Sequence, residues 1–397
     1  MNTDPGKGEG GDGKALVCPL RRPCFGHVRR FRTPATVLPR PRAFGKFLIF
    51  YYYITKVASG IHFTKQQAIF SIEVTAPSFR NTLVLLVQSA ARSYSCRRKR
   101  KTMTQDPHQI LQDLQPTKSF FVGIDSDGCA FDTMEIKHKE CFCPNFIRYW
   151  ELQNISKYAR EAWDFVNLYS QTRGCNRFHA VIEALRLLAE RKEVKVRGAN
   201  IPDVTPLKEW VKHETKLGNP ALERYAREQK NPVIDRTLAW SKAVNQSIGD
   251  MVYGIPPFPW VRESLIKFQD RADVIVVSQT PGEALVREWA EHHIDQYVRI
   301  ICGQEYGTKT EHIRYAAKGK YKGNCMLMIG DAPGDMSAAK SNGALFFPIN
   351  PGHEEDSWER LYKDGIDRFF DGTFAGTYEQ KLIDEFNTCL PKTPSWA

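Results

Sequence analysis

Short, nearly uncharged runs of apolar residues recur along residues 118–390, and amphipathic segments separate them. Runs of this kind are typical of strands buried on both faces of a parallel sheet, whereas apolar residues spaced three and four apart predict helices. Strand and helix alternating in this way predict an α/β fold, a doubly wound parallel sheet with helices on both faces. The predicted strands are residues 120–124, 274–277, 298–303, 326–329 and 344–349.

Helical spacing interrupts this alternation between the first two predicted strands. Apolar residues such as Ala159, Trp163 and Val166 recur at positions that share one face of a helix, and a cluster of prolines at 256–259 marks the exit of the segment. We therefore expect one domain to be inserted into another. The predicted domains are an α/β core of residues 118–135 and 260–390 and an inserted helical domain of residues 136–259.

The basic charge is concentrated before the first predicted strand. Residues 1–102 carry 19 of the 56 Lys and Arg residues but only 4 of the 45 Asp and Glu residues, so the formal net charge of +11 arises there. Neither apolar patch in this leader has the roughly 20 residues that a transmembrane helix needs, and its start lacks the layout of a secretory signal. We expect residues 1–103 to be a poorly ordered extension, or to precede a natural start at Met103, and we expect neither nucleic acid nor membrane as a partner.

The ten cysteines are scattered without paired spacing. Cys141 and Cys143 form one close pair, but a zinc site needs a second pair or nearby histidines. Reduced thiols and a cytoplasmic location are therefore expected.

Polar residues follow three of the predicted strands. Asp125 and Asp127 end the first strand, Ser278 ends the second, and Asp331 and Asp335 follow the run at 326–329. The carboxyl ends of strands are where ligands bind in such sheets, so these side chains should meet. Residues two apart share one side of an extended segment, which would let Asp125 attack a substrate while Asp127 moves a proton. The alternative for the first pair alone is an Asx-rich turn.

Four carboxylates in one site need a cation, because they repel one another when ionised together. The candidate ligands are hard oxygens with neither His nor Cys among them, which favours Mg²⁺. Magnesium bound in this way commonly bridges carboxylates to a phosphate. The pattern therefore indicates phosphoryl chemistry.

The order of these motifs resembles the haloacid dehalogenase (HAD) superfamily: D-x-D-G, then Ser278, then Lys309 at the start of a helical segment, then G-D-x-x-x-D. The resemblance implies a HAD-like core with a helical cap inserted between motifs one and two. It also implies that Asp125 is a nucleophile that forms an aspartyl-phosphate, and that Asp127 protonates the leaving oxygen and then activates water.

The same resemblance implies the ligand set. Asp125, the backbone carbonyl of Asp127, and Asp331 would hold the magnesium, and Asp335 would support them. Ser278 and Lys309 would bind the phosphoryl oxygens.

Within this superfamily, the resemblance implies that an Asp at position 127 favours a phosphatase, a magnesium-dependent phosphoric monoester hydrolase acting on a small phosphorylated metabolite. The alternatives are a phosphomutase of the same fold, a dehalogenase, and a non-catalytic binding protein that retains the fold. Sugar phosphates, nucleotides and phosphoglycolate all remain possible substrates, and the oligomeric state is open.

The candidate substrate contacts lie in two segments. Gln279 follows Ser278, and the segment from Thr172 to His179 opens a strongly amphipathic helix of the insertion with Arg173, Asn176 and Arg177. These groups suit a second anionic or hydroxylated part of a substrate. Arginines are also common on exposed helical surfaces, so a purely structural role is the alternative.

Overall fold

The computed structural model describes residues 106–397, so the expectations for residues 1–103 lie outside the described part of the chain. Five strands form one sheet in the order β3-β2-β1-β4-β5, and all neighbouring strands run parallel. The predicted α/β class with a parallel sheet is confirmed. The strands are β1 (Phe120–Ile124), β2 (Ala272–Val277), β3 (Ile300–Cys302), β4 (Met326–Gly330) and β5 (Leu345–Pro348).

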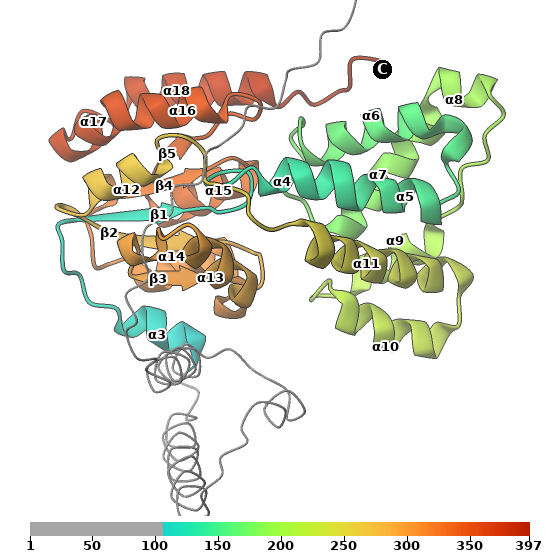
Figure 1. Ribbon diagram of the computed structural model, residues 1–397, viewed down its shortest axis with the longest axis horizontal. Helices are drawn as coiled ribbons and strands as arrows, with labels where there is room; N and C mark the ends of the chain where they lie inside the picture. The colour runs from blue at the N-terminus through green and yellow to red at the C-terminus, as the bar shows by residue number, and fades with distance from the viewer. Residues whose placement is uncertain (1–105) are drawn as a thin grey trace, which may run out of the picture. The chain divides into compact units, whose positions relative to one another are not determined.

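Helices cover both faces of the sheet, which explains why its strands lack polar alternation (Figure 1). On β1, Val122 packs into one apolar cluster and Phe121 into another on the opposite face. The helix α18 (Thr377–Cys389) contributes Leu382 to the first cluster and Phe386 to the second. The first cluster is completed by α12 (Val261–Phe268), α16 (Glu354–Arg360) and α17 (Ile366–Asp371), and the second by α3 (Pro107–Asp113), α14 (Lys309–Ala316) and α15 (Pro333–Asn342).

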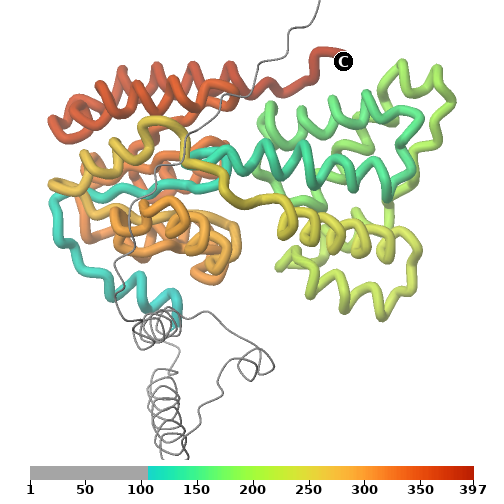
Figure 2. The backbone as a smooth tube through the Cα atoms, in the orientation of Figure 1, coloured from blue at the N-terminus to red at the C-terminus, as the bar shows by residue number. Residues whose placement is uncertain are grey.

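Residues 133–251 form a helical domain with its own apolar core (Figures 1 and 2). Trp163 and Trp240 are fully buried in this core and meet edge to face at 5.9 Å between ring centroids. Within residues 106–397, no helix combines the length and apolar character needed to cross a membrane. The main helices of the domain are α4 (Thr133–Ile136), α5 (Cys143–Tyr149), α6 (Ser156–Asn167), α7 (Arg177–Glu190), α8 (Lys192–Val196), α9 (Thr205–His213), α10 (Asn219–Gln229) and α11 (Pro232–Met251).

The two connections between the core and the helical domain lie side by side. Phe131 and Pro257 form an antiparallel bridge, and the Phe258 amide donates to the Ala130 carbonyl at 2.9 Å. The chain therefore leaves the sheet after β1 and returns beside its point of departure. The proline cluster at 256–259 forms the returning connection.

A π-helix, η1 (Lys137–Phe142), joins α4 to α5 at the start of the helical domain. π-Helical turns are rare and are frequent at functional sites, because the extra residue per turn rotates the side chains that follow. Lys137 and His138, at the start of this turn, both line the pocket described below.

The C-terminal segment returns from the core to the helical domain. After α18, the Trp396 ring contacts Phe165 of α6 at 5.7 Å between centroids and lies against the Arg191 guanidinium at 4.4 Å. Trp396 thereby joins the apolar core of the helical domain.

Candidate active site

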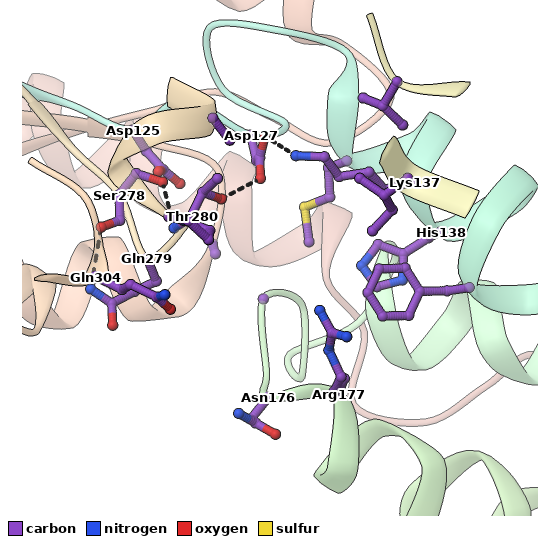
Figure 3. Close-up of a pocket in the computed structure, with 18 of the residues that line it drawn as sticks. Asp125, Asp127, Lys137, His138, Asn176, Arg177, Ser278, Gln279, Thr280 and Gln304 are labelled. Atoms are coloured by element: carbon purple, nitrogen blue, oxygen red, sulfur yellow. Dashed lines mark hydrogen bonds and ion pairs between the residues drawn. The ribbon is translucent and has the colours of Figure 1, made fainter. Parts of the chain in front are cut away.

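A pocket of about 850 Å³ lies between the strand ends of the core and the helical domain (Figure 3). Nine of the residues predicted from the sequence line it, whereas Asp335 is fully buried beneath it. The predicted residues that line the pocket are Asp125, Asp127, Arg173, Asn176, Arg177, Ser278, Gln279, Lys309 and Asp331.

The register of the sheet brings the core residues together. Ile124 of β1 pairs with Val276 of β2 and with Ile329 of β4. Because the three strands are parallel and adjacent, the residues that follow these positions emerge at one edge of the sheet. Asp125, Ser278 and Asp331 therefore converge although they are far apart in the sequence.

Lys309 lies between two buried carboxylates. Its Nζ donates to Asp125 Oδ2 at 2.6 Å and to Asp335 Oδ1 at 2.7 Å. Burial acts to lower the pKa of Lys309, but the surrounding carboxylates outweigh burial and raise this pKa. Lys309 is the first residue of α14, where Thr308 and Glu311 form a capping box, so the ammonium group projects from a fixed helix end.

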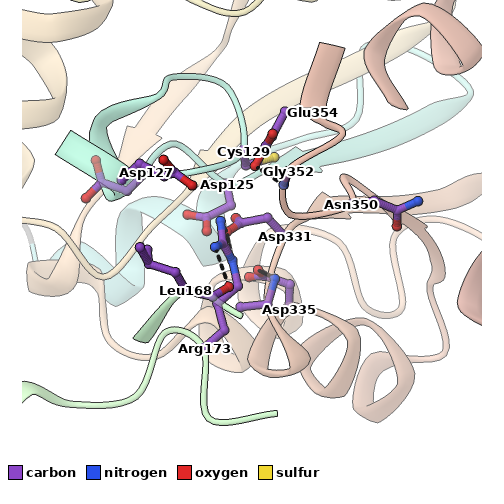
Figure 4. A network of polar contacts seen from close by, with 12 residues as sticks. Asp125, Asp127, Cys129, Leu168, Arg173, Asp331, Asp335, Asn350, Gly352 and Glu354 are labelled. Carbon is purple, nitrogen blue, oxygen red and sulfur yellow. Dashed lines mark hydrogen bonds and ion pairs between the residues drawn. The ribbon is translucent and has the colours of Figure 1, made fainter. Parts of the chain in front are cut away.

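Asp331 is paired with an arginine of the helical domain (Figure 4). Arg173 Nε and Nη2 lie 2.8 Å and 2.6 Å from Asp331 Oδ2, while Arg173 Nη1 donates to the Leu168 carbonyl at 2.9 Å. Arg173 is only 3% exposed. Its guanidinium is therefore engaged with the core carboxylate, which differs from the predicted contact with substrate.

Gly128 leaves the space that this ion pair occupies. Its φ is +77°, and a Cβ at this position would lie 2.7 Å from both Arg173 Nη2 and Asp331 Oδ2. Both the left-handed backbone and the close approach of the pair therefore require glycine here.

Three of the buried carboxylates fit a cation site. One oxygen from each of Asp125, Asp331 and Asp335 lies within 4.8 Å of the others, and Asp331 Oδ1 is buried without a hydrogen-bond partner. Burial raises the pKa of Asp125 and of Asp331, although Lys309 and Arg173 respectively oppose the rise. The donor set, hard oxygens with one orphaned acceptor, suits a hard divalent cation.

Asp127 is held by three donors. Lys137 Nζ and Thr133 Oγ1 each donate to Oδ1 at 2.6 Å, and Thr280 Oγ1 donates to Oδ2 at 2.7 Å. Burial would raise the pKa of Asp127, but the Lys137 cation and these hydrogen bonds together lower it to about 2. The carboxylate is therefore ionised and can accept a proton.

Ser278 and Gln279 continue from the end of β2. Ser278 is 2% exposed, its amide donates to the Cys302 carbonyl at 3.0 Å, and its Oγ accepts from the Thr280 amide at 3.2 Å. Gln279 Nε2 donates to the Gly307 carbonyl at 2.9 Å. Gln279 thus ties the loop that precedes α14 to the end of β2.

Asn176 and Arg177 begin α7 in the opposite wall (Figure 3). Asn176 Oδ1 accepts from the Phe178 amide at 3.0 Å and caps the helix. Arg177 Nη1 donates to Ser241 Oγ at 3.1 Å and to Asn245 Oδ1 at 2.7 Å. Asn176 therefore has a structural task, whereas Arg177 presents a cation at the pocket wall.

Among the pocket residues that were absent from the prediction, four polar ones lie close to the predicted site: Lys137, His138, Thr280 and Glu288. Thr280 follows Ser278 by two positions, so the rule that residues two apart share a side could have found it. Lys137 and His138 begin the π-helical turn, for which the sequence carried no signal. Burial and the Asp127 carboxylate raise the pKa of Glu288 to about 7, and its partner Ser126 donates to it at 3.2 Å.

No family model and no curated protein matches the chain. Solved structures do resemble it. A haloacid dehalogenase-like family hydrolase from Streptococcus pneumoniae aligns at 13% identity and a TM-score of 0.34, over 62% of this chain and 92% of that one. A HAD-superfamily hydrolase from Geobacter sulfurreducens aligns at 13% identity and a TM-score of 0.30, over 59% of this chain and 89% of that one.

A phosphonoacetaldehyde hydrolase-like protein from Oleispira antarctica aligns at 8% identity and a TM-score of 0.39, over 70% of this chain and 88% of that one. Because all three TM-scores lie below 0.5, the function is inferred below from the side chains of this chain alone.

Proposed function

We propose that this protein is a magnesium-dependent phosphoric monoester hydrolase of the HAD type, acting on a small phosphorylated metabolite through an aspartyl-phosphate. The observation that carries the proposal is the contact of Lys309 with Asp125 at 2.6 Å, in a pocket that Asp331 also lines. A carboxylate at a strand end, a fixed ammonium group and a potential cation site are the parts that phosphoryl transfer to a carboxylate needs.

The side chains of Asp125 and Asp331 and the backbone carbonyl of Asp127 would hold the cation. When bound, Mg²⁺ would neutralise charge on the phosphoryl oxygens and on the carboxylates. Asp335 would act through its neighbours, because its two oxygens accept from Lys309 Nζ at 2.7 Å and from the Ala332 amide at 3.1 Å. It thereby orients Lys309 and the turn that carries Asp331.

The reaction would proceed in two displacements. A carboxylate oxygen of Asp125 bonds to phosphorus while the bond from phosphorus to the alcohol oxygen breaks, and that oxygen takes up a proton. Water then attacks phosphorus, the bond to Asp125 breaks, and inorganic phosphate leaves. Lys309 Nζ and Ser278 Oγ would donate to the phosphoryl oxygens as negative charge grows on them.

Asp127 serves the proton transfers. Its ionised carboxylate can take the proton of the attacking water. To protonate the leaving oxygen first, it must itself receive a proton from solvent or from the substrate phosphate, whose negative charge beside Asp127 would oppose its ionisation. This arrangement supports a phosphate ester as substrate rather than a halide, since a halide leaves without a proton.

The cysteines support a reducing, cytoplasmic setting for this activity. Among residues 106–397 the cysteines are free thiols, and Cys129, Cys141, Cys143 and Cys302 are buried. No disulfide contributes to the described fold.

The test is phosphate release from a panel of phosphorylated metabolites, with Mg²⁺ and with a chelator. Activity should require Mg²⁺ and should fall by about 1,000-fold or more in Asp125→Asn, because the nucleophile is removed. The exposed residue Asp235, in the first turn of α11, provides the control variant Asp235→Asn. Undiminished phosphate release in Asp125→Asn would overturn the mechanism, and transfer to a second hydroxyl without net release would identify a phosphomutase instead.

A further inference from the structure

Arg177 is a cation without a charged partner in the wall of the pocket. Its guanidinium lies over the Phe142 ring at 4.9 Å, and its Nη1 donates only to neutral acceptors, on Ser241 and Asn245. Within residues 106–397, no carboxylate forms an ion pair with it. Burial lowers the pKa of Arg177 to about 10, which reflects the free-energy cost of removing this charge from water.

Three other cations of the pocket are compensated by carboxylates, and the remaining one, Arg287, is exposed to solvent. Lys309 contacts Asp125, Lys137 contacts Asp127, and Arg173 contacts Asp331, each at 2.6 Å. A partly desolvated charge is costly unless an opposite charge or a ligand accompanies it. Arg177 therefore differs from these three cations, because a ligand would have to supply its counter-charge.

His138, beside Arg177 in this wall, is a neutral donor. Trp163 Nε1 donates to His138 Nδ1 at 3.2 Å, which places the ring proton on Nε2. Burial, followed by the charges of Arg173, Lys137 and Arg177, lowers the pKa of His138 to about 3, so the ring stays neutral at physiological pH. An Nε2–H donor and a guanidinium thus line the same pocket.

Two helix N-termini add to the positive potential of this wall. Arg177 is the first residue of α7, and Asn219 is the first residue of α10, whose cap position, Gly218, has no side chain to satisfy the free amides. Gly218 and Asn219 both line the pocket. The carboxylates Glu288 and Glu291 also line it, but they lie on α13 (Gly282–Glu291), which belongs to the core.

We propose that the alcohol part of the substrate carries a second anionic group, a carboxylate or a second phosphate, which binds Arg177 while the phosphate to be cleaved lies at Asp125. This inference rests on the proposed hydrolase function and names its substrate class. An anion at Arg177 gains a charge-assisted hydrogen bond from the guanidinium and a favourable helix end. The pocket, at about 850 Å³, has room for both groups.

The experiment compares kcat/KM for three kinds of phosphate ester in the full chain and in Arg177→Gln. The substrates are a phosphorylated hydroxy acid, a sugar bisphosphate, and two esters without a second anion, glycerol 3-phosphate and an aryl phosphate. The relevant substrate is the doubly anionic ester that the protein cleaves best. For this ester, the Arg177→Gln substitution should lower kcat/KM about 10- to 100-fold more than it does for the esters with one anion, mainly by raising KM. The larger loss, with the carboxylate or with the bisphosphate, identifies which second anion is bound.

Two further variants keep the result interpretable. Arg177→Lys retains the cation and should recover part of the lost discrimination. Arg186→Gln removes an arginine of the same helix whose partners are Glu183 and Glu190 on the exposed face, and it should leave all the rates near those of the unaltered protein.

The two hypotheses fail in different ways. If the unaltered protein releases no phosphate from any ester, the proposed function is wrong. If it is an active phosphatase but Arg177→Gln lowers kcat/KM equally for esters with one and two anions, only the proposal about the second anion is overturned.

Discussion

In the core wall of the pocket Lys309 contacts two carboxylates, whereas in the helical wall Arg177 faces the pocket with neutral partners. Lys309 is shared by Asp125 and Asp335, and every one of these groups is anchored by a strand end or a helix end. Around Arg177, the partners are a serine and an asparagine. Charges that compensate one another give a site that is organised before substrate arrives, which is what catalysis of phosphoryl transfer needs.

The helical wall differs in that its cation Arg177 has no counter-charge among the residues that the structure describes. A cation that lacks a counter-charge within the protein adds little to its stability, but it adds affinity for a ligand that brings the missing charge. In the proposed function the core wall would account for the chemistry, and the helical wall would account for the choice of substrate. The predictions below change one wall at a time.

Replacing Lys309 should have the largest effect. In Lys309→Met the buried carboxylates of Asp125 and Asp335 lose their shared cation, which should lower the free energy of unfolding by about 3–5 kcal/mol and abolish turnover. The control is Lys363→Met, which breaks an exposed pair with Glu359 one helical turn away. Denaturant unfolding measures both variants, and equal stability losses would contradict the buried network.

Replacing Gly128 should have an intermediate effect. Gly128 and Gly198 both have positive φ, +77° and +61°, but a Cβ at Gly198 would meet no atom within 4 Å. Both alanine variants should lose about 1–2 kcal/mol from the left-handed backbone. Gly128→Ala should lose roughly 1–3 kcal/mol more, because its Cβ would collide with the Arg173–Asp331 pair.

The difference between these two glycine variants measures the crowding around the Arg173–Asp331 pair, to which Met134 Cβ, 2.9 Å from the added Cβ, also contributes. It can be read from equilibrium unfolding curves of the two proteins. Identical losses would mean that the Arg173–Asp331 pair moves aside without cost.

Replacing His138 should have the smallest effect, visible only as a change with pH. The folded pKa of about 3 lies below the ordinary value of 6.5, so the unfolded chain binds a proton first as the pH falls from about 6.5 toward 3. Stability is therefore lost on acidification. Between pH 7 and pH 5, the melting temperature of the His138→Gln variant should fall less than that of the unaltered protein.

The exposed His179 of α7 provides the matched control for this comparison. His179→Gln should retain the full acid sensitivity of the unaltered protein. If the two variants have parallel profiles, His138 does not contribute to the pH dependence.

The sheet and the core side of the site could be predicted because they depend on local signals. Each apolar run is itself a strand, and parallel strands must bring Asp125, Ser278 and Asp331 to one edge. Both ends of β1 agree with the prediction, and the ends of the other strands differ from it by at most two residues, for example at β3 (Ile300–Cys302), which is shorter than its apolar run.

The contacts between the walls could not be predicted, because they join distant positions through helix packing. Arg173 and Asp331 are 158 residues apart, and Lys137 reaches Asp127 from the first position of a π-helical turn. The sequence suggested one shared role for Arg173, Asn176 and Arg177. In the structure the three residues pair with the core, cap a helix and face the pocket, respectively.

Trp396 limits how the pocket can open. A body joined to another by two neighbouring connections can rotate about them, and the connections at Ala130–Phe131 and Pro257–Phe258 are of that kind. Trp396 adds a third attachment, on Phe165 and Arg191, carried by the segment that follows α18. A wide rotation of the helical domain would first have to detach this indole ring, so a residue that does not line the pocket would limit access to it.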